Sequence, residues 1–153
     1  MIEEIKTFPL RLEQITSTFS ASQWYKSYKP GALSAGQLVN HLGDVYMSAY
    51  FLTKLVLTDD DPDITIYDEH LFNLLPDSDY MVNATIAILS NLVQRWVFLL
   101  CAIPEEDFKR KLYYPIYSRS IPLVELIALY AWRGTLNLDH LEIIRNTNPS
   151  EFK

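Results

Sequence analysis

The sequence predicts an all-α protein: a four-helix bundle with a short extended segment before the last helix. Three observations predict this class. Four long stretches carry apolar residues at the three- and four-residue spacing of a buried helix face. The 153 residues include only four glycines, too few for the many tight turns of an all-β fold. No repeat or linker divides the sequence, so we expect residues 1–153 to form one domain.

The first two helices are predicted from apolar spacing and from start signals. Residues 10–19 form the first, and the second runs from Ser34 to about residue 57. Ser34 and Gln37 have the spacing of a capping box, in which each side chain bonds the backbone N–H of the other residue. Residues 20–23 repeat this pattern and predict a short extra turn. The core face of the second helix is expected to hold Leu38, Leu42, Val45, Ala49, Leu52 and Val56.

The last two long helices are expected over about residues 78–102 and 121–145. Pro104 ends the third helix, and Pro122 is tolerated because it lies in the first turn of the fourth. Cys101, the single cysteine, lies in an apolar stretch and is expected to be buried as a small hydrophobic residue. The inward face of the third helix is expected to hold Met81, Thr85, Ile88, Leu92, Trp96 and Leu99.

Two connections are too long to be simple turns. Residues 58–77 are acidic, and residues 68–75 within them are expected to form a short helix. This connection is expected to fold over one end of the bundle. Residues 108–121 alternate enough to predict an extended, hairpin-like segment. The apolar side chains expected to dock the acidic connection are Tyr67, Leu71, Phe72 and Leu75.

Charge and hydropathy exclude two classes of partner. The net charge is −6 and no long basic cluster occurs, so a nucleic-acid-binding face is not expected. No uncharged apolar run approaches the ~20 residues of a membrane span, and the first residues lack an apolar signal core. We therefore expect a soluble cytoplasmic protein.

Two of the three histidines lie among core-facing residues of long helices. His41 shares a stripe of the second helix with Val45 and Leu52, and His140 shares a stripe of the fourth with Ile144. Facing helices of a bundle are where metal and cofactor sites are built. The alternative is two histidines at the edge of the core, hydrogen-bonded to neighbouring side chains. His70 lies in the acidic connection and is expected to be solvated.

Residues 28–31 (Tyr-Lys-Pro-Gly) and 37–44 (Gln-Leu-Val-Asn-His-Leu-Gly-Asp) resemble the second-helix signature of the DinB superfamily. The finer resemblance is to its YfiT-like branch, which includes bacillithiol S-transferases and metal-dependent hydrolases. It implies a four-helix bundle, often a homodimer, that holds a divalent ion such as zinc or nickel through three histidines. Supporting pieces extend the resemblance over about residues 8–145: residues 57–58, 62, 67–69, 75–77, 95–96, 105–108, 114–115 and 129–132.

By this resemblance His41 matches the first metal ligand and His140 the last, while Leu136 stands at the middle position. A catalytic zinc site usually keeps three protein ligands. His41 and His140 are therefore expected to be remnant ligands, with no resident cofactor in the site. Arg133 also stands where the family has a histidine, and its charge opposes a cation. The candidate pocket comprises His41, Asp44, Arg133, Leu136, Asn137 and His140.

Three functions stay open at this point. A metal-free member of the family would bind a small molecule, such as an anion held by Arg133 and protonated His140. An active member would use a metal to activate a thiol or water, as an S-transferase or a hydrolase. A third alternative is a dimeric interaction module. The replacement of a ligand by Leu136 favours the first and the third.

Overall fold

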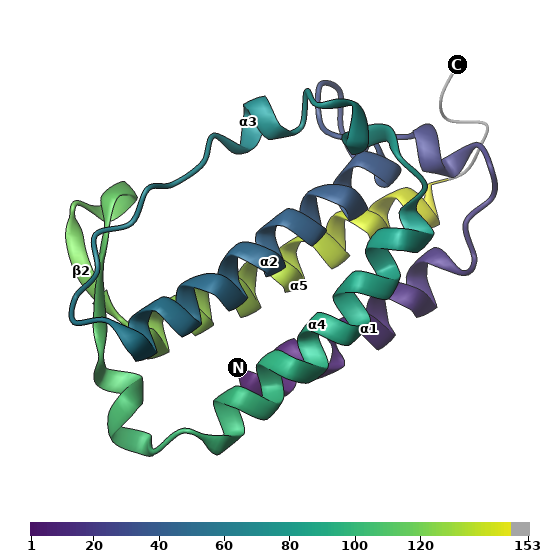
Figure 1. Ribbon diagram of the computed structural model, residues 1–153. Coiled ribbons are helices and arrows are strands. Elements are labelled where there is room, and N and C mark those ends of the chain that lie inside the picture. Colours follow the sequence, from purple (N-terminus) through teal and green to yellow (C-terminus); the bar gives the residue numbers. More distant parts are fainter. Residues whose placement is uncertain (148–153) are drawn as a thin grey trace.

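Four long helices form a bundle with a hairpin at one end in the computed structural model, which describes residues 1–147 (Figure 1). Helix α1 packs against α4 and α5, and α2 packs against the same two helices. Four apolar faces therefore close around one core, as the sequence predicts. The long helices are α1 (Ile2–Thr16), α2 (Ala35–Thr58), α4 (Val82–Ala102) and α5 (Leu123–Asn146).

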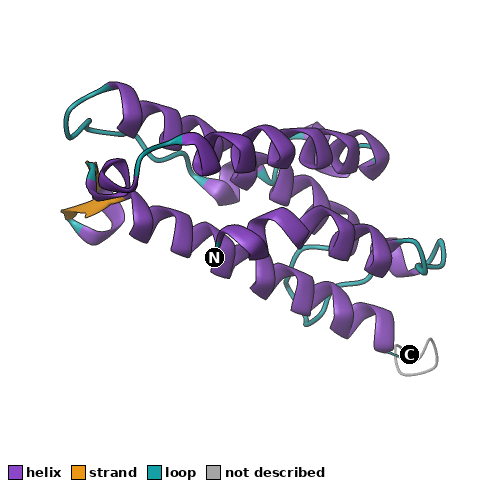
Figure 2. Cartoon of the chain, turned by 90° about the horizontal axis from the view of Figure 1, so that it is seen from below, coloured by secondary structure: helices purple, strands orange, loops and turns teal. Residues whose placement is uncertain are grey.

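Short elements fill the connections. Strands β1 (Lys111–Tyr114) and β2 (Arg119–Pro122) pair in antiparallel register, with Leu112 opposite Ile121. The extended segment expected over residues 108–121 is therefore confirmed, and Figure 2 shows it at the end of the bundle away from the C-terminal end of α5. The remaining short helices are η1 (Gln23–Tyr25), α3 (Glu69–Phe72), η2 (Pro76–Asp79), η3 (Glu105–Lys109) and η4 (Pro115–Tyr117).

Helices α2 and α4 run in the same direction, which decides the path of the chain between them (Figure 1). With a rise of 1.5 Å per residue, α2 is about 36 Å long. The chain must travel back over that distance before α4 can begin. Residues 59–81, named here the α2–α4 connection, therefore lie lengthwise along the bundle. The expectation that they fold over one end is wrong.

The α2–α4 connection docks through its first half. Ile64 is buried, and Tyr67 is half-buried as expected. The other three predicted docking residues, Leu71, Phe72 and Leu75, are exposed. The short helix expected over residues 68–75 is present as α3, and its first turn is capped by the Asp68 carboxylate, which accepts a hydrogen bond from the N–H of Leu71.

Helix starts agree with the sequence at α2 and differ at α1 and α4. The Ser34–Gln37 capping box is confirmed, because each side chain accepts from the other's backbone N–H, at 3.2 and 3.1 Å. Helix α4 begins later than expected because residues 76–79 form the separate turn η2. Helix α1 begins at Ile2 and runs through Pro9, since its buried stripe continues on both sides of the proline as Ile5, Phe8, Leu12 and Ile15.

The inward face of α4 differs from the expected one. Trp96 alone of the predicted set is buried, while Met81 and Ile88 are exposed. Cys101 is exposed and is not the buried residue that we expected. Most polar side chains of α4 lie on one side of the helix and its buried residues lie opposite them, whereas the predicted stripe lay between these two sides. The buried residues of α4 are Leu89, Val93, Trp96 and Leu100.

Helix α4 is also the one described helix long and apolar enough to cross a membrane by length and composition. It packs along α1 and α2 as a helix of the bundle, and Trp96 is fully buried between them. A core helix of a soluble protein passes the same test, so no membrane protein is indicated.

Tyr46 of α2 is the point at which the four long helices meet. Its ring stacks on Phe8 of α1 at 4.4 Å and meets the edge of Trp96 of α4 at 5.9 Å between ring centroids. Its hydroxyl passes over Gly134 of α5, where an added Cβ would lie 2.2 Å from the oxygen. A side chain at position 134 would therefore force α5 away from α2.

A buried hydrogen bond between α2 and α4 gives a stability prediction. The indole N–H of Trp96 donates to Thr53 Oγ1 at 3.0 Å, and both side chains are fully buried. Thr53→Val keeps the shape of the side chain but leaves the indole N–H without an acceptor. We expect the free energy of unfolding in urea to fall by about 1–3 kcal/mol. Thr58→Val, at the exposed end of the same helix, should change it by less than about 0.5 kcal/mol. Equal losses would contradict the assignment.

Candidate functional site

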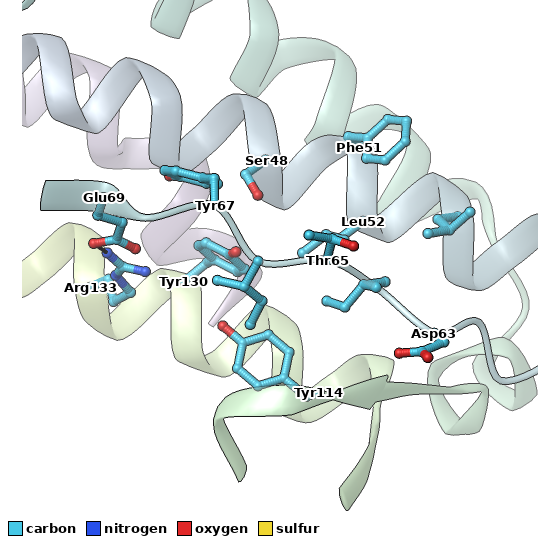
Figure 3. A pocket seen from close by; sticks show the side chains of 13 residues that line it. Ser48, Phe51, Leu52, Asp63, Thr65, Tyr67, Glu69, Tyr114, Tyr130 and Arg133 are labelled. Carbon is cyan, nitrogen blue, oxygen red and sulfur yellow. Dashed lines mark hydrogen bonds and ion pairs between the residues drawn. The ribbon is translucent and has the colours of Figure 1, made fainter. Parts of the chain in front are cut away.

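The α2–α4 connection lies over the groove between α2 and α5 and closes a cavity of about 400 Å³ there (Figure 3). We call this cavity the tyrosine pocket. Helix α2 supplies Ser48 and Leu52 to its wall, and α5 supplies Tyr130 and Arg133. Figure 3 shows Arg133 and Glu69 together at one end and Phe51 toward the other. The remaining lining residues are Leu55, Asp63, Ile64, Thr65, Ile66, Tyr67 and Tyr114.

Glu69 joins the connection to both helices beneath it. Arg133 Nη2 donates to Glu69 Oε2 at 2.7 Å, and His41 Nε2 lies 3.7 Å from the same oxygen. Burial lowers the pKa of His41, and the Arg133 charge lowers it further, while Glu69 and Asn73 act in the opposite direction. His41 is therefore neutral at pH 7, and the charges of this cluster are those of Arg133 and Glu69.

Three phenols line the pocket beside the ion pair. Burial raises the pKa of Tyr67, Tyr114 and Tyr130, so all three stay protonated at neutral pH. The hydroxyls of Ser48 and Tyr114 act against this rise in the pKa of Tyr130, and in Figure 3 the Tyr114 hydroxyl points toward Tyr130. The pocket thus combines one guanidinium with several neutral hydroxyls.

The connection is held at both of its ends as well. At its start, Arg110 Nη2 donates to the carbonyl of Asp59 at 2.9 Å. At its end, the buried Asn40 side chain donates to the carbonyls of Ser78 and Tyr80 at 3.0 and 2.9 Å. With these bonds on either side, the Glu69 ion pair is the polar contact that fastens the middle of the connection.

The structure brings together only some of the six predicted site residues. Arg133 lines the tyrosine pocket, whereas His41 and Asp44 line a second cavity of about 290 Å³ beside α4. Burial raises the pKa of Asp44, and the charge of Asp77 raises it further. His41 and Arg133 are linked through Glu69, which sequence analysis did not single out.

The other three predicted residues have different surroundings. The His140 ring stacks on Tyr28 with 3.7 Å between centroids and an angle of 4° between planes. Asn137 Nδ2 donates to the backbone carbonyl of Arg133 at 2.9 Å. Leu136 is 36% exposed, so it is not the buried leucine that its matching position suggested. These three residues are not among those that line the two cavities. His70 is exposed, as expected.

The donor set does not fit a three-ligand divalent metal centre. Among residues 1–147, no three or more His, Cys, Asp or Glu side chains are placed to hold one ion. The charged neighbours of His41 are one carboxylate and one guanidinium, and the guanidinium already supplies a positive charge to Glu69. A divalent ion beside His41 would meet that like charge.

The fold and the position of the site define the class of protein. The model of the DinB superfamily matches residues 5–140, and the chain belongs to this superfamily. A protein of Bacillus pumilus named "Putative metal-dependent hydrolase" is 32% identical over 145 residues, which are 94% of this chain and 83% of that protein. The YfiT protein of Bacillus subtilis, which carries the same designation, is 32% identical over 92% of this chain and 79% of its own length.

A solved structure of YfiT from Bacillus subtilis has the same fold. It superposes with a TM-score of 0.89 at 31% sequence identity and covers 94% of this chain and 82% of that chain. It is described as a probable metal-dependent hydrolase with an unusual four-helix bundle topology. The YfiT-like, four-helix assignment made from the sequence is therefore confirmed.

Sequence analysis did not place Glu69, Tyr67, Tyr114 or Asn40 in the site. All four lie in pieces of the chain that carry the family resemblance, residues 37–44, 67–69 and 114–115. No spacing rule relates these pieces to Arg133, so the sequence indicated the family and not the contacts between them.

The burial of His41 predicts a loss of stability in acid. Its pKa is lowered in the folded protein, whereas the unfolded chain titrates near pH 6.5. Protonation therefore favours the unfolded chain, and stability present above about pH 6.5 is lost as the pH falls below it. We expect the free energy of unfolding in urea to fall between about pH 7.5 and about pH 5.5.

Two variants check the assignment of that loss. His41→Gln should reduce the pH dependence, and part should remain because burial also lowers the pKa of His140. His70→Gln, at an exposed position, should leave it unchanged. A pH dependence that is the same in wild type and His41→Gln would contradict the prediction.

Proposed function

We propose that this chain is a metal-free member of the DinB superfamily that binds a small molecule in the tyrosine pocket. The observation that carries the proposal is the Arg133–Glu69 ion pair beside His41, because it sets a guanidinium next to the first expected metal ligand. The exposed Leu136 and the stacked His140 also support a degenerate metal site. The cavity, open to solvent on one side and lined by hydroxyls, charged groups and apolar side chains, supports ligand binding.

The positive charge offered to a ligand is that of Arg133 alone. His140 lies seven residues along the same helix, a rise of about 10 Å, and its ring is held against Tyr28. Burial and the charge of Lys29 lower the pKa of His140, so it is neutral at pH 7. We therefore do not carry forward the idea that protonated His140 shares an anion with Arg133.

An active metal-dependent hydrolase or thiol S-transferase is the alternative function. The name of the Bacillus pumilus relative favours it. It would need ligands beyond His41, and the described residues do not group three donors at one point. We place the protein in the cytoplasm, where reducing conditions would keep the exposed Cys101 unpaired.

Metal content separates these two functions. We expect wild-type protein purified without added metal to contain no stoichiometric zinc or nickel by elemental analysis. Leu136→His supplies an imidazole one helical turn from His140, and adding Arg133→Gln removes the opposing charge. We expect the double variant to gain melting temperature with zinc or nickel, because ligand binding stabilises the folded state. The wild type should gain little.

The control is Val124→His, which adds a histidine at another exposed apolar position of α5. An equal gain there would mean that the effect is not specific to position 136. Fully metal-loaded wild type would overturn the proposed function in favour of the enzyme.

Assembly into a homodimer is the second part of the proposal. Helix α4 leaves apolar side chains in solvent, with Phe98 77% exposed and Ile88 also exposed, and Phe51 of α2 is exposed too. Apolar surface of this kind favours association of two copies. We expect sedimentation velocity to give a dimer and Phe98→Glu to shift it to monomer, while Ile116→Glu on the exposed hairpin should not. A monomeric wild type would contradict the dimer.

A further inference from the structure

The guanidinium of Arg133 has more donors than partners. Arg133 is the single positively charged side chain among the described residues that line the tyrosine pocket, and it is only 19% exposed. A guanidinium carries five N–H donors. Within residues 1–147 the structure records one hydrogen bond from it, to Glu69 Oε2. The remaining N–H groups can donate to a second acceptor group. A carboxylate suits a guanidinium because its two oxygens accept two parallel hydrogen bonds.

Glu69 is a partner that can leave. Its side chain is 35% exposed, and it lies at the start of α3, a helix of four residues with no buried side chain. Of the apolar side chains that follow, Leu71 is exposed, and Phe72 is 41% exposed with its ring against Tyr67 of the same connection. An incoming carboxylate can therefore replace that of Glu69 while the two ends of the connection stay bound at Arg110 and Asn40.

The rest of the pocket is suited to an apolar group with one polar end. The Tyr130 and Ser48 hydroxyls lie between the ion pair and the apolar end, where Leu52 is buried and Phe51 lies at the mouth (Figure 3). Figure 3 also places the Asp63 carboxylate at the end away from Arg133. A second negative charge on the ligand would meet this carboxylate, so one anionic group is favoured.

We propose that the tyrosine pocket binds a small amphipathic monocarboxylic acid, whose carboxylate replaces Glu69 on the Arg133 guanidinium and whose apolar part lies against Leu52 and Phe51. This inference rests on the proposed function, small-molecule binding without a metal, and names the class of ligand. The cavity of about 400 Å³ is within the size range of small-molecule sites.

Calorimetric titration with three matched probes tests the ligand class. Phenylacetate carries the carboxylate, phenylacetamide is its neutral analogue, and phenethylamine carries a positive charge on the same ring. We expect the wild type to bind phenylacetate about tenfold or more tightly than phenylacetamide, because hydrogen bonds between charged groups exceed neutral ones. Phenethylamine should bind more weakly than phenylacetate, because its ammonium group carries the same charge as the Arg133 guanidinium.

Variants of the ion pair test the replacement step. Glu69→Gln removes the competing carboxylate and should tighten phenylacetate binding by about threefold to tenfold. Arg133→Gln should weaken it by about tenfold or more. Arg119→Gln is the matched control, because it breaks the exposed ion pair between Arg119 of the hairpin and Glu125 of α5 and should leave the affinity unchanged.

The possible outcomes separate this inference from the proposed function. Tighter binding of the amide or the amine, or unchanged affinity in Glu69→Gln, would overturn the proposal that the ligand is a carboxylic acid. The proposal of small-molecule binding would stand. Binding of none of the probes by folded wild type would overturn the inference too. Stoichiometric metal in the wild type would overturn the proposed function itself. Thermal unfolding is followed for each variant, and if Arg133→Gln does not fold, Arg133→Lys and Glu69→Gln decide.

Discussion

The parallel direction of α2 and α4 is the constraint on which the rest of the structure depends. A chain that leaves α2 at one end must return along the bundle before it can start α4, and residues 59–81 do so over the groove between α2 and α5. Ile64, in the first half of this segment, is buried against that groove. The tyrosine pocket exists because this segment forms its outer wall, and Glu69 reaches Arg133 because the same segment passes over α5.

The charges of the site follow from burial. A guanidinium that is largely removed from water needs a counter-ion, and breaking such a pair by removing one partner is costly. Glu69 supplies that counter-ion to Arg133 and also lies near His41, which burial keeps neutral. The connection is thus joined to α5 by an ion pair, and the same carboxylate lies near His41 of α2. In this arrangement the positive charge beside Glu69 is carried by the Arg133 side chain, whereas in a metal site a bound divalent ion would carry it.

Helices α2 and α4 differ in how well their core faces were predicted. All six residues predicted for the core of α2 are buried. In α4 most polar side chains lie on one side and the buried stripe lies opposite them, whereas the predicted stripe lay between the two and was wrong at Met81 and Ile88. Cys101 was misplaced because the last turns of α4 are apolar all round, so its apolar neighbours did not identify the buried side. The first turns of α1 lay outside the predicted range of residues 10–19.

The sequence by itself determined the four long helices, the hairpin before α5, the Ser34–Gln37 capping box and membership of the DinB superfamily. These features depend on residues close together in the chain or on motifs in a fixed order, and both can be recognised from the amino-acid sequence alone. Only the tertiary structure decided that Glu69 pairs with Arg133, that Asn40 holds the end of the connection and that Leu136 is exposed. Contacts between residues so far apart depend on helix direction and on which face is buried, and local spacing specifies neither.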